Sequence, residues 1–194
     1  MKKIATLFQR DPDDRRYVLP VVTPGCEWVL AGEGRPTQKF DGTCVQLDDA
    51  GRWWARREVK PGKTPPPDYV PVTTDPVTGK TMGWEPVGQS AFARFHAEAL
   101  QGDGGEETAF GPGTYELVGP KINGNPERSD RHRLIAHATA GTVDVPLLTF
   151  DGIRETVLDA GSRGVEGIVW HHEDGRRMVK IKARDFRQES APSA

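Results

Sequence analysis

The segment Thr37-Gln38-Lys39-Phe40-Asp41-Gly42-Thr43-Cys44 places a lysine at the end of a weakly polar strand, ahead of an Asp-Gly turn that leads into a second strand. A lysine acts as a nucleophile only after it has lost its proton, which burial and neighbouring cations promote. The same short pattern is also typical of an exposed lysine beside an ordinary turn. Lys39 is therefore a candidate nucleophile whose assignment depends on what the rest of the chain supplies.

The pattern of apolar residues on either side of this segment predicts a strand-rich α+β fold. Two segments, Gln89–Leu100 and Gly152–Ala160, have the apolar spacing of helices, and Asp151 is the expected N-cap of the second. Turn-forming residues at 48–51 and 173–175 are expected to join neighbouring strands into antiparallel hairpins. The expected strands are Cys26–Ala31, Thr43–Leu47, Arg52–Glu58, Thr114–Gly119, Arg133–His137, Val165–His171 and Arg176–Lys182.

Two segments lack a clear periodicity. Residues 60–86 contain seven prolines in 27 positions, which predicts a long inserted loop, either an ordered flap on the substrate side or a passive linker. Residues 188–194 are expected to be a flexible tail. A single domain is therefore expected to span residues 1–187.

The composition is that of a globular protein with little net charge. Hydrophobic residues make up 36% of the 194 residues, and 22 glycines bring the apolar share to the ordinary level. The formal net charge of −2 excludes a basic nucleic-acid coat and a polybasic membrane binder. No stretch reaches the roughly 18 apolar residues of a membrane span, and Met1–Asp14 lacks the apolar core of a signal peptide. Because Cys26 and Cys44 alone form neither a disulfide framework nor a four-ligand zinc site, we expect a cytoplasmic protein.

Further along the chain, charged residues follow Lys39 in a characteristic order. Glu116 precedes Leu117, Glu166 opens Glu166-Gly-Ile-Val-Trp-His171, and Lys180 and Lys182 form a Lys-x-Lys pair. This series resembles the motifs of the covalent nucleotidyltransferases, the superfamily of ATP-dependent ligases and RNA capping enzymes. The chain is most similar to the small ATP-dependent 5′–3′ RNA ligases of the vertebrate type. The shared stretches are Lys39-x-Asp-Gly-Thr-Cys44, Trp54-Ala-Arg56, Lys60-Pro61, Gly83-Trp84, Pro86-Val87, Glu116-Leu117, Ile122-Asn-Gly-Asn-Pro126 and Glu166-Gly-Ile-Val-Trp-His171.

The resemblance implies a single nucleotidyltransferase (adenylation) domain with antiparallel sheets around an ATP cleft. It also implies catalytic roles for three lysines: Lys39 would attack the α-phosphorus of ATP and hold AMP, while Lys180 and Lys182 would neutralise the phosphate. These two lysines alternate with Val179 and Ile181, so both are expected on one face of a strand. Glu166 would bind Mg²⁺, or alternatively Mn²⁺. If it shares the lysines' face, the intervening loop is expected to have an odd length or a bulge.

The resemblance further implies the residues that bind the nucleotide. Glu116 would hold the ribose hydroxyls, and Arg56 matches the nucleotide-contacting arginine of the family. The backbone of Thr37 and Gln38 would read the adenine. Gln38 departs from the family pattern, in which glutamate is common, and the stretch between Trp84 and Glu116 is shorter than in relatives.

The expected substrate is RNA with 5′-phosphate and 3′-hydroxyl ends. Only Ala183–Ala194 follow the Lys-x-Lys pair, so we expect no oligonucleotide-binding barrel and hence RNA ends in place of wrapped DNA. The stretches Arg52–Lys63 and Arg176–Arg187 carry net charges of +4 and +5, which suits a phosphate backbone.

The alternative functions are a capping-type or DNA-end ligase, and an RNA-end binding protein with a relict pocket. The oligomeric state does not follow from the sequence. His132 and His137 resemble a family segment near the nucleobase, and Cys44 is expected to be a small packing residue.

Overall fold

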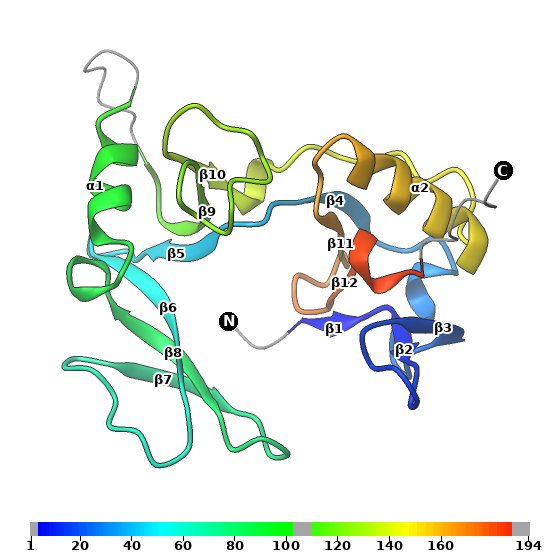
Figure 1. Ribbon diagram of the computed structural model, residues 1–194, viewed down its shortest axis with the longest axis horizontal. Coiled ribbons are helices and arrows are strands. Elements are labelled where there is room, and N and C mark those ends of the chain that lie inside the picture. The colour runs from blue at the N-terminus through cyan, green and yellow to red at the C-terminus, as the bar shows by residue number, and fades with distance from the viewer. Residues whose placement is uncertain (1–3, 103–109, 188–194) are drawn as a thin grey trace, which may run out of the picture. The chain divides into compact units, whose positions relative to one another are not determined.

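The computed structural model describes residues 4–102 and 110–187, and the chain there is rich in β-sheet (Figure 1). The predicted tail, 188–194, lies outside these residues. Two α-helices, α1 (Ala93–Leu100) and α2 (Phe150–Ser162), confirm the two predicted helical segments. The α+β class is confirmed. The strands are β1 (Ala5–Thr6), β2 (Phe8–Arg10), β3 (Val18–Val22), β4 (Arg35–Lys39), β5 (Thr43–Leu47), β6 (Trp53–Val59), β7 (Val70–Thr74), β8 (Thr81–Pro86), β9 (Gly113–Val118), β10 (Arg133–Ala136), β11 (Gly167–His171) and β12 (Met178–Lys182).

Contacts within the described residues group the chain into two compact units. One comprises residues 41–140, and the other combines residues 4–40 with residues 141–187. The chain passes from one unit to the other directly after Phe40. Lys39 and the Asp-Gly turn that follows it therefore belong to different units. The single nucleotidyltransferase domain expected for residues 1–187 remains a prediction.

The first unit is built on a six-stranded antiparallel sheet in the order β10-β9-β5-β6-β8-β7. Side chains alternate along each strand, so Val45, Leu47, Tyr115 and Leu117 fall on the face that forms the core with Ala99 of α1. The residues between them project from the opposite face. That second face carries Cys44 and Glu116, which lie directly across from one another on β5 and β9.

The second unit holds a four-stranded sheet in the order β1-β12-β11-β4 and the separate hairpin β2-β3. β1 runs parallel to β12, whereas the other neighbours are antiparallel. One face of the sheet packs against α2, which lies beside these strands in Figure 1. The buried residues of that face and of the helix are Ile168, Trp170, Val179, Ile181, Ile153 and Val157.

Two predictions from local sequence patterns were wrong. The predicted strand Cys26–Ala31 is a 3-10 helix, Glu27–Val29, in which Trp28 and Val29 enter the core of the second unit without strand pairing. The predicted loop, residues 60–86, contains β7 and β8. β8 pairs with β6 on one side and β7 on the other, so neighbouring strands stabilise a segment whose prolines hide its periodicity.

None of the helices within the described ranges has the length and hydropathy needed to cross a membrane. Cys26 and Cys44 are both buried, and neither forms a disulfide within the part of the chain that the structure describes.

Helix α2 provides a first testable result, because its N-cap is Thr149 and not the expected Asp151. The Thr149 hydroxyl accepts a hydrogen bond from the backbone N–H of Gly152 at 3.2 Å. Thr149→Ala is expected to lower the free energy of unfolding by about 1 kcal/mol, measured by urea denaturation, because this N–H loses its partner. Asp151→Ala serves as the control and is expected to cost about 0.5 kcal/mol or less. A larger loss for Asp151→Ala than for Thr149→Ala would contradict the assignment.

Candidate functional site

A row of three residues crosses the sheet of the second unit at the end of its strands. Gly167 of β11 lies directly opposite Lys39 of β4 on one side and Lys182 of β12 on the other. Because neighbouring strands are about 4.8 Å apart, the two lysines start roughly 10 Å from one another on the same face. Gly167 has no side chain, so the space between them is left open.

The carboxylate of Glu166 fills this space. Its Oε2 pairs with the Lys39 ammonium and its Oε1 with the Lys182 ammonium. A third cation, Arg184, lies 3.5 Å from Oε1, and the Lys39 Nζ also donates to the backbone oxygen of Phe40 at 3.2 Å. The side chain of Glu166 is only 6% exposed. The structure thus brings the expected nucleophile, the expected metal ligand and one of the expected phosphate-binding lysines into direct contact.

The positive charges of the neighbouring lysines keep Glu166 ionised. Burial alone would raise the pKa of this carboxyl group, but the positive charges of Lys39 and Lys182 and their hydrogen bonds outweigh it. The pKa of Glu166 is therefore below its ordinary value. The group is an anion at neutral pH, shared between two cations.

The expected loop geometry between Glu166 and the lysines was wrong. β11 and β12 pair without a shift, and the six residues 172–177 connect them, an even number. Glu166 reaches the lysines because it lies outside β11, opposite Ala183, where the partner segment turns into the 3-10 helix Ala183–Asp185. Strict alternation of side chains ends at Gly167 and does not determine the direction of Glu166.

The next row on the same face contains Lys180, Val169 and Thr37. Lys180 and Lys182 therefore share a face with Lys39, as the alternation predicts. The Thr37 hydroxyl is buried and donates to the backbone oxygen of Val169 at 3.1 Å. Gln38 alternates to the other face, and its backbone N–H donates to the carbonyl of Gly141 at 2.9 Å. That N–H is consequently committed within the fold.

Glu116 and Arg56, the other expected nucleotide ligands, belong to the first unit. Glu116 Oε1 accepts a hydrogen bond from the Gly42 N–H at 3.1 Å, and its Oε2 lies 3.0 Å from His137 Nε2. Arg56 flanks Ala55, whose side chain is in the core, so the guanidinium projects from the same face of the sheet as Cys44 and Glu116. Its Nε is buried and has no hydrogen-bond partner among the described residues. A buried donor without a partner is costly, which suits a site for an anion or a hydroxyl group.

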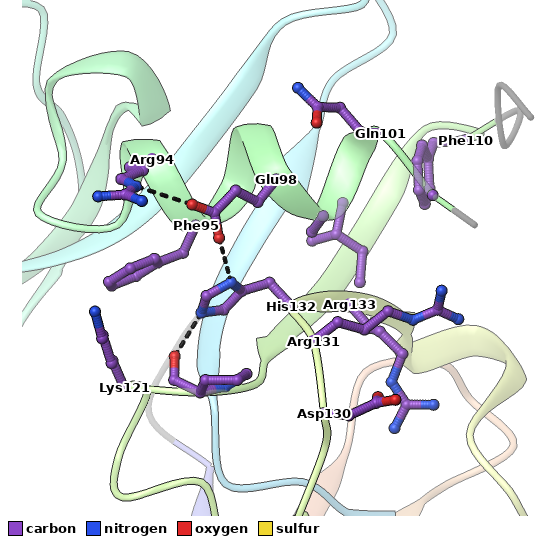
Figure 2. A pocket seen from close by; sticks show the side chains of 14 residues that line it. Arg94, Phe95, Glu98, Gln101, Phe110, Lys121, Asp130, Arg131, His132 and Arg133 are labelled. Atoms are coloured by element: carbon purple, nitrogen blue, oxygen red, sulfur yellow. Dashed lines mark hydrogen bonds and ion pairs between the residues drawn. The ribbon is translucent and has the colours of Figure 1, made fainter. Parts of the chain in front are cut away.

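The first unit also has a cavity of about 700 Å³, shown in Figure 2. Its four cations come from α1, from the loop before β10 and from β10 itself, namely Arg94, Lys121, Arg131 and Arg133. Glu98 connects Arg94 to the ring of His132, and hydrogen bonds from Arg94 and His132 hold the pKa of Glu98 below its ordinary value. The ring of Phe95 stacks on that of His132 at 4.5 Å between centroids. Sequence reasoning missed this basic cavity, because its cations are scattered over 40 positions and form no local run.

In the folded chain, nearby carboxylates pair with several cations of the two basic stretches of the sequence. Within Arg176–Arg187, Arg177 pairs with Asp174, Lys182 pairs with Glu166 and Arg187 pairs with Asp11. Within Arg52–Lys63, Arg52 pairs with Asp48, and Arg57 lies 3.9 Å from Glu85. Nearby carboxylates thus offset much of the excess positive charge.

Gly167 gives a second testable result. A Cβ atom at this position would overlap the carbonyl oxygen of Ile181 and lie 2.7 Å from the Cα of Lys182. Gly167→Ala is expected to lower the free energy of unfolding by about 2 kcal/mol, measured by urea denaturation, because backbone on the adjacent strand must move. Gly141→Ala, in the same unit, places its Cβ in open space and is expected to stay within about 0.5 kcal/mol of the parent. Equal stability of the two variants would refute this close packing at Gly167.

Comparison with known proteins points to one enzyme family. Residues 108–187 match the family model of RNA ligase 1. The chain is 34% identical over 73 residues to RNA ligase 1 of Danio rerio and 36% identical over 73 residues to RNA ligase 1 of Mus musculus. Each alignment covers 35% of this chain and 22% of the relative, so the chain matches less than a quarter of their length.

The family match includes Glu116, Glu166, Lys180 and Lys182 but not Lys39. The matched region thus contains the glutamate and one of the lysines that meet Lys39 in the second unit. These matches support an RNA ligase relationship, and residues 108–187 of this chain are similar to RNA ligase 1.

Proposed function

We propose that this chain is an ATP-dependent RNA ligase that forms a covalent lysyl-AMP intermediate on Lys39. The observation that carries the proposal is the contact of Lys39 and Lys182 with one buried carboxylate, Glu166, on a sheet face that also bears Lys180. The similarity of residues 108–187 to RNA ligase 1 supports the same chemistry. The alternative, an RNA-end binding protein with a relict pocket, would not need the nucleophile.

In the first step, neutral Lys39 Nζ attacks the α-phosphorus of ATP. An N–P bond forms, the bond from the α-phosphorus to the bridging oxygen breaks, and pyrophosphate leaves with the electron pair. Lys39 Nζ, which pairs with Glu166 as an ammonium, loses one proton to solvent before the attack and a second one after it, so that a single N–H remains in the phosphoramide. Lys180 and Lys182 stabilise the charge that gathers on the phosphoryl oxygens, since both lie on the face of Lys39.

In the later steps, a 5′-phosphate oxygen of RNA attacks the lysine-bound AMP and the N–P bond breaks. The 3′-hydroxyl of a second RNA end then attacks the 5′-phosphorus, and AMP leaves as a phosphodiester bond forms. Glu116 and Arg56 are proposed to hold the nucleotide, together with the backbone of Thr37 and Gln38. The buried, unpartnered Nε of Arg56 supports this role.

Glu166 is also the proposed ligand of Mg²⁺, with Mn²⁺ as a substitute. Its carboxylate oxygens are ligands of the kind that Mg²⁺ takes alongside water and phosphate oxygens. The ion would have to displace Lys39 and Lys182 from these oxygens, and both lysines would then be available to the substrate phosphates. When bound, the ion supplies further neutralisation of phosphate charge.

Incubation with α-labelled ATP or GTP and Mg²⁺ tests the proposal. Label is expected on the protein from ATP and not from GTP, and it should be released as AMP when 5′-phosphorylated RNA with a 3′-hydroxyl end is added. Label from GTP would favour a capping-type enzyme, and no label from either nucleotide would overturn the covalent mechanism. Sealing of nicked DNA without joining of RNA would overturn the assignment of the substrate.

A further inference from the structure

Three side chains with metal-binding atoms converge on the face of the first unit's sheet that is opposite its core. They are Cys44 of β5, Glu116 of β9 and His137, the first residue of the 3-10 helix that follows β10. One ligand atom from each lies within 4.8 Å of the other two. We propose that these residues form a binding site for Zn²⁺ or a similar transition-metal ion. The site goes beyond the proposed ligase chemistry and is open to the ion when no nucleotide is bound, because Glu116 is also a proposed nucleotide ligand.

The register of the sheet explains why these residues meet. Cys44 and Glu116 are directly paired across β5 and β9, so their side chains stand next to one another on the same face. β10 pairs with the other edge of β9, and its last residue, Ala136, lies opposite Tyr115. His137 follows at once and reaches back to the Glu116 face, where its ring contacts both Glu116 and Thr114.

Hydrogen bonds already hold two of the three ligands in place. The Thr114 hydroxyl lies 3.0 Å from His137 Nδ1, which positions Nε2 toward Glu116. Nε2 lies 3.0 Å from Glu116 Oε2 and donates its proton to that carboxylate. An ion bound between the two groups would replace this proton, and Nδ1 would then donate to the Thr114 hydroxyl. Glu116 Oε1 accepts from the Gly42 N–H at 3.1 Å, and Asn123 fixes that turn by donating to the Gly42 carbonyl at 2.8 Å. The other oxygen of Glu116 remains directed at the site.

The donor set selects the kind of ion. Thiolate sulfur and imidazole nitrogen suit Zn²⁺ and Co²⁺, whereas Mg²⁺ prefers oxygen ligands alone. Binding releases the thiol proton of Cys44, and the resulting thiolate and the Glu116 carboxylate balance the charge of a divalent ion. The neighbouring cation Arg56 therefore faces a neutral complex. Three protein ligands leave one position of a tetrahedral ion for water or for an exchangeable ligand.

The burial of the three residues suits an ion that enters from solvent. Cys44 is 6% exposed, the Glu116 side chain is 12% exposed and the His137 side chain is 27% exposed. The sulfur is thus shielded, while the imidazole provides an approach. Sequence reasoning missed the site because its ligands, at positions 44, 116 and 137, have no recognisable spacing.

Cobalt titration of the untagged, chelator-treated chain tests the proposal. Co²⁺ is expected to produce a thiolate-to-cobalt charge-transfer band in the near ultraviolet, which Zn²⁺ then abolishes by displacement. Cys44→Ser is expected to remove this band, and His137→Gln and Glu116→Gln are expected to weaken Co²⁺ binding by about tenfold or more. The control variants, Cys26→Ala and His172→Gln, should leave the band and the affinity unchanged. A band that persists in Cys44→Ser would overturn the site.

A second measurement uses the unsubstituted chain and so does not depend on how Cys44→Ser folds. Iodoacetamide labelling followed by peptide mass spectrometry should show that Zn²⁺ slows alkylation of Cys44 and leaves that of Cys26 unchanged. Equal rates at Cys44 with and without Zn²⁺ would overturn the proposal. Neither readout requires ligase activity, so a failure of the proposed function leaves both measurements informative.

Discussion

Replacement of Lys39 by alanine is expected to abolish transfer of label from α-labelled ATP to the protein, by at least about 10³-fold. The reason is specific to this amine, since no other group can form the N–P bond in its position. Lys180 and Lys182 share its face of the sheet, but their roles require them to remain charged. RNA joining from ATP should fall in parallel. Joining of RNA that already carries a 5′-adenylate should be reduced far less, because that step needs no lysyl-AMP.

The measurement is autoradiography of the protein after denaturing electrophoresis, with the labelled peptide identified by mass spectrometry. Lys80→Ala is the matched control, because Lys80 belongs to the first unit and has no proposed role in the chemistry. Its ammonium forms a half-exposed ion pair with Glu58 at 3.0 Å. This control should label like the parent chain. Full labelling of Lys39→Ala would refute the nucleophile assignment, and loss of label in both variants would indicate damage to the fold and not to the chemistry.

Glu166→Gln is expected to reduce self-labelling by at least about 10²-fold and to reduce stability as well. The amide cannot balance the charges of Lys39 and Lys182, so both ammonium groups lose their common partner while largely shielded from solvent. Removing one partner of a buried charge cluster is destabilising, here by about 2 kcal/mol in the free energy of unfolding at pH 7.

The difference in stability should depend on pH in a definite direction. The pKa of Glu166 in the folded chain is lowered, so the native state favours the carboxylate. Its contribution is therefore fully present above the pKa of an unfolded glutamate, about 4.3, and is lost as the pH falls through the lower folded value. Urea denaturation from pH 7 down to about pH 3 should show the parent chain losing its advantage over Glu166→Gln.

Glu155→Gln is the control for both effects, because Glu155 is exposed on α2 in the same unit. It should match the parent in self-labelling and should stay within about 0.5 kcal/mol of it at pH 7. A stability difference between the parent and Glu166→Gln that is the same at pH 7 and at pH 3 would contradict the charge-based explanation.

Much of the fold was accessible from local patterns. Thr43–Leu47 was predicted exactly, and the strands at Trp53–Val59, Gly113–Val118 and Met178–Lys182 were predicted to within two residues at each end. These strands alternate clearly and end at recognisable turns, which are properties of a few adjacent residues. β7 and β8 were missed because their stability depends on pairing with β6 and not on their own pattern.

The amino-acid sequence is enough to show which chemical groups are present and which side chains of a strand share a face. The Lys39 strand end, the paired faces of Lys180 and Lys182 and the order of the charged motifs all follow from it. The pairing of β4 with β11, about 130 residues away, is visible only in the folded chain. It places Gly167 between Lys39 and Lys182 and leaves room for Glu166. The same holds for the meeting of Cys44, Glu116 and His137. Alternation is set by the backbone within each strand, whereas the choice of neighbouring strand and register comes from packing of the whole core.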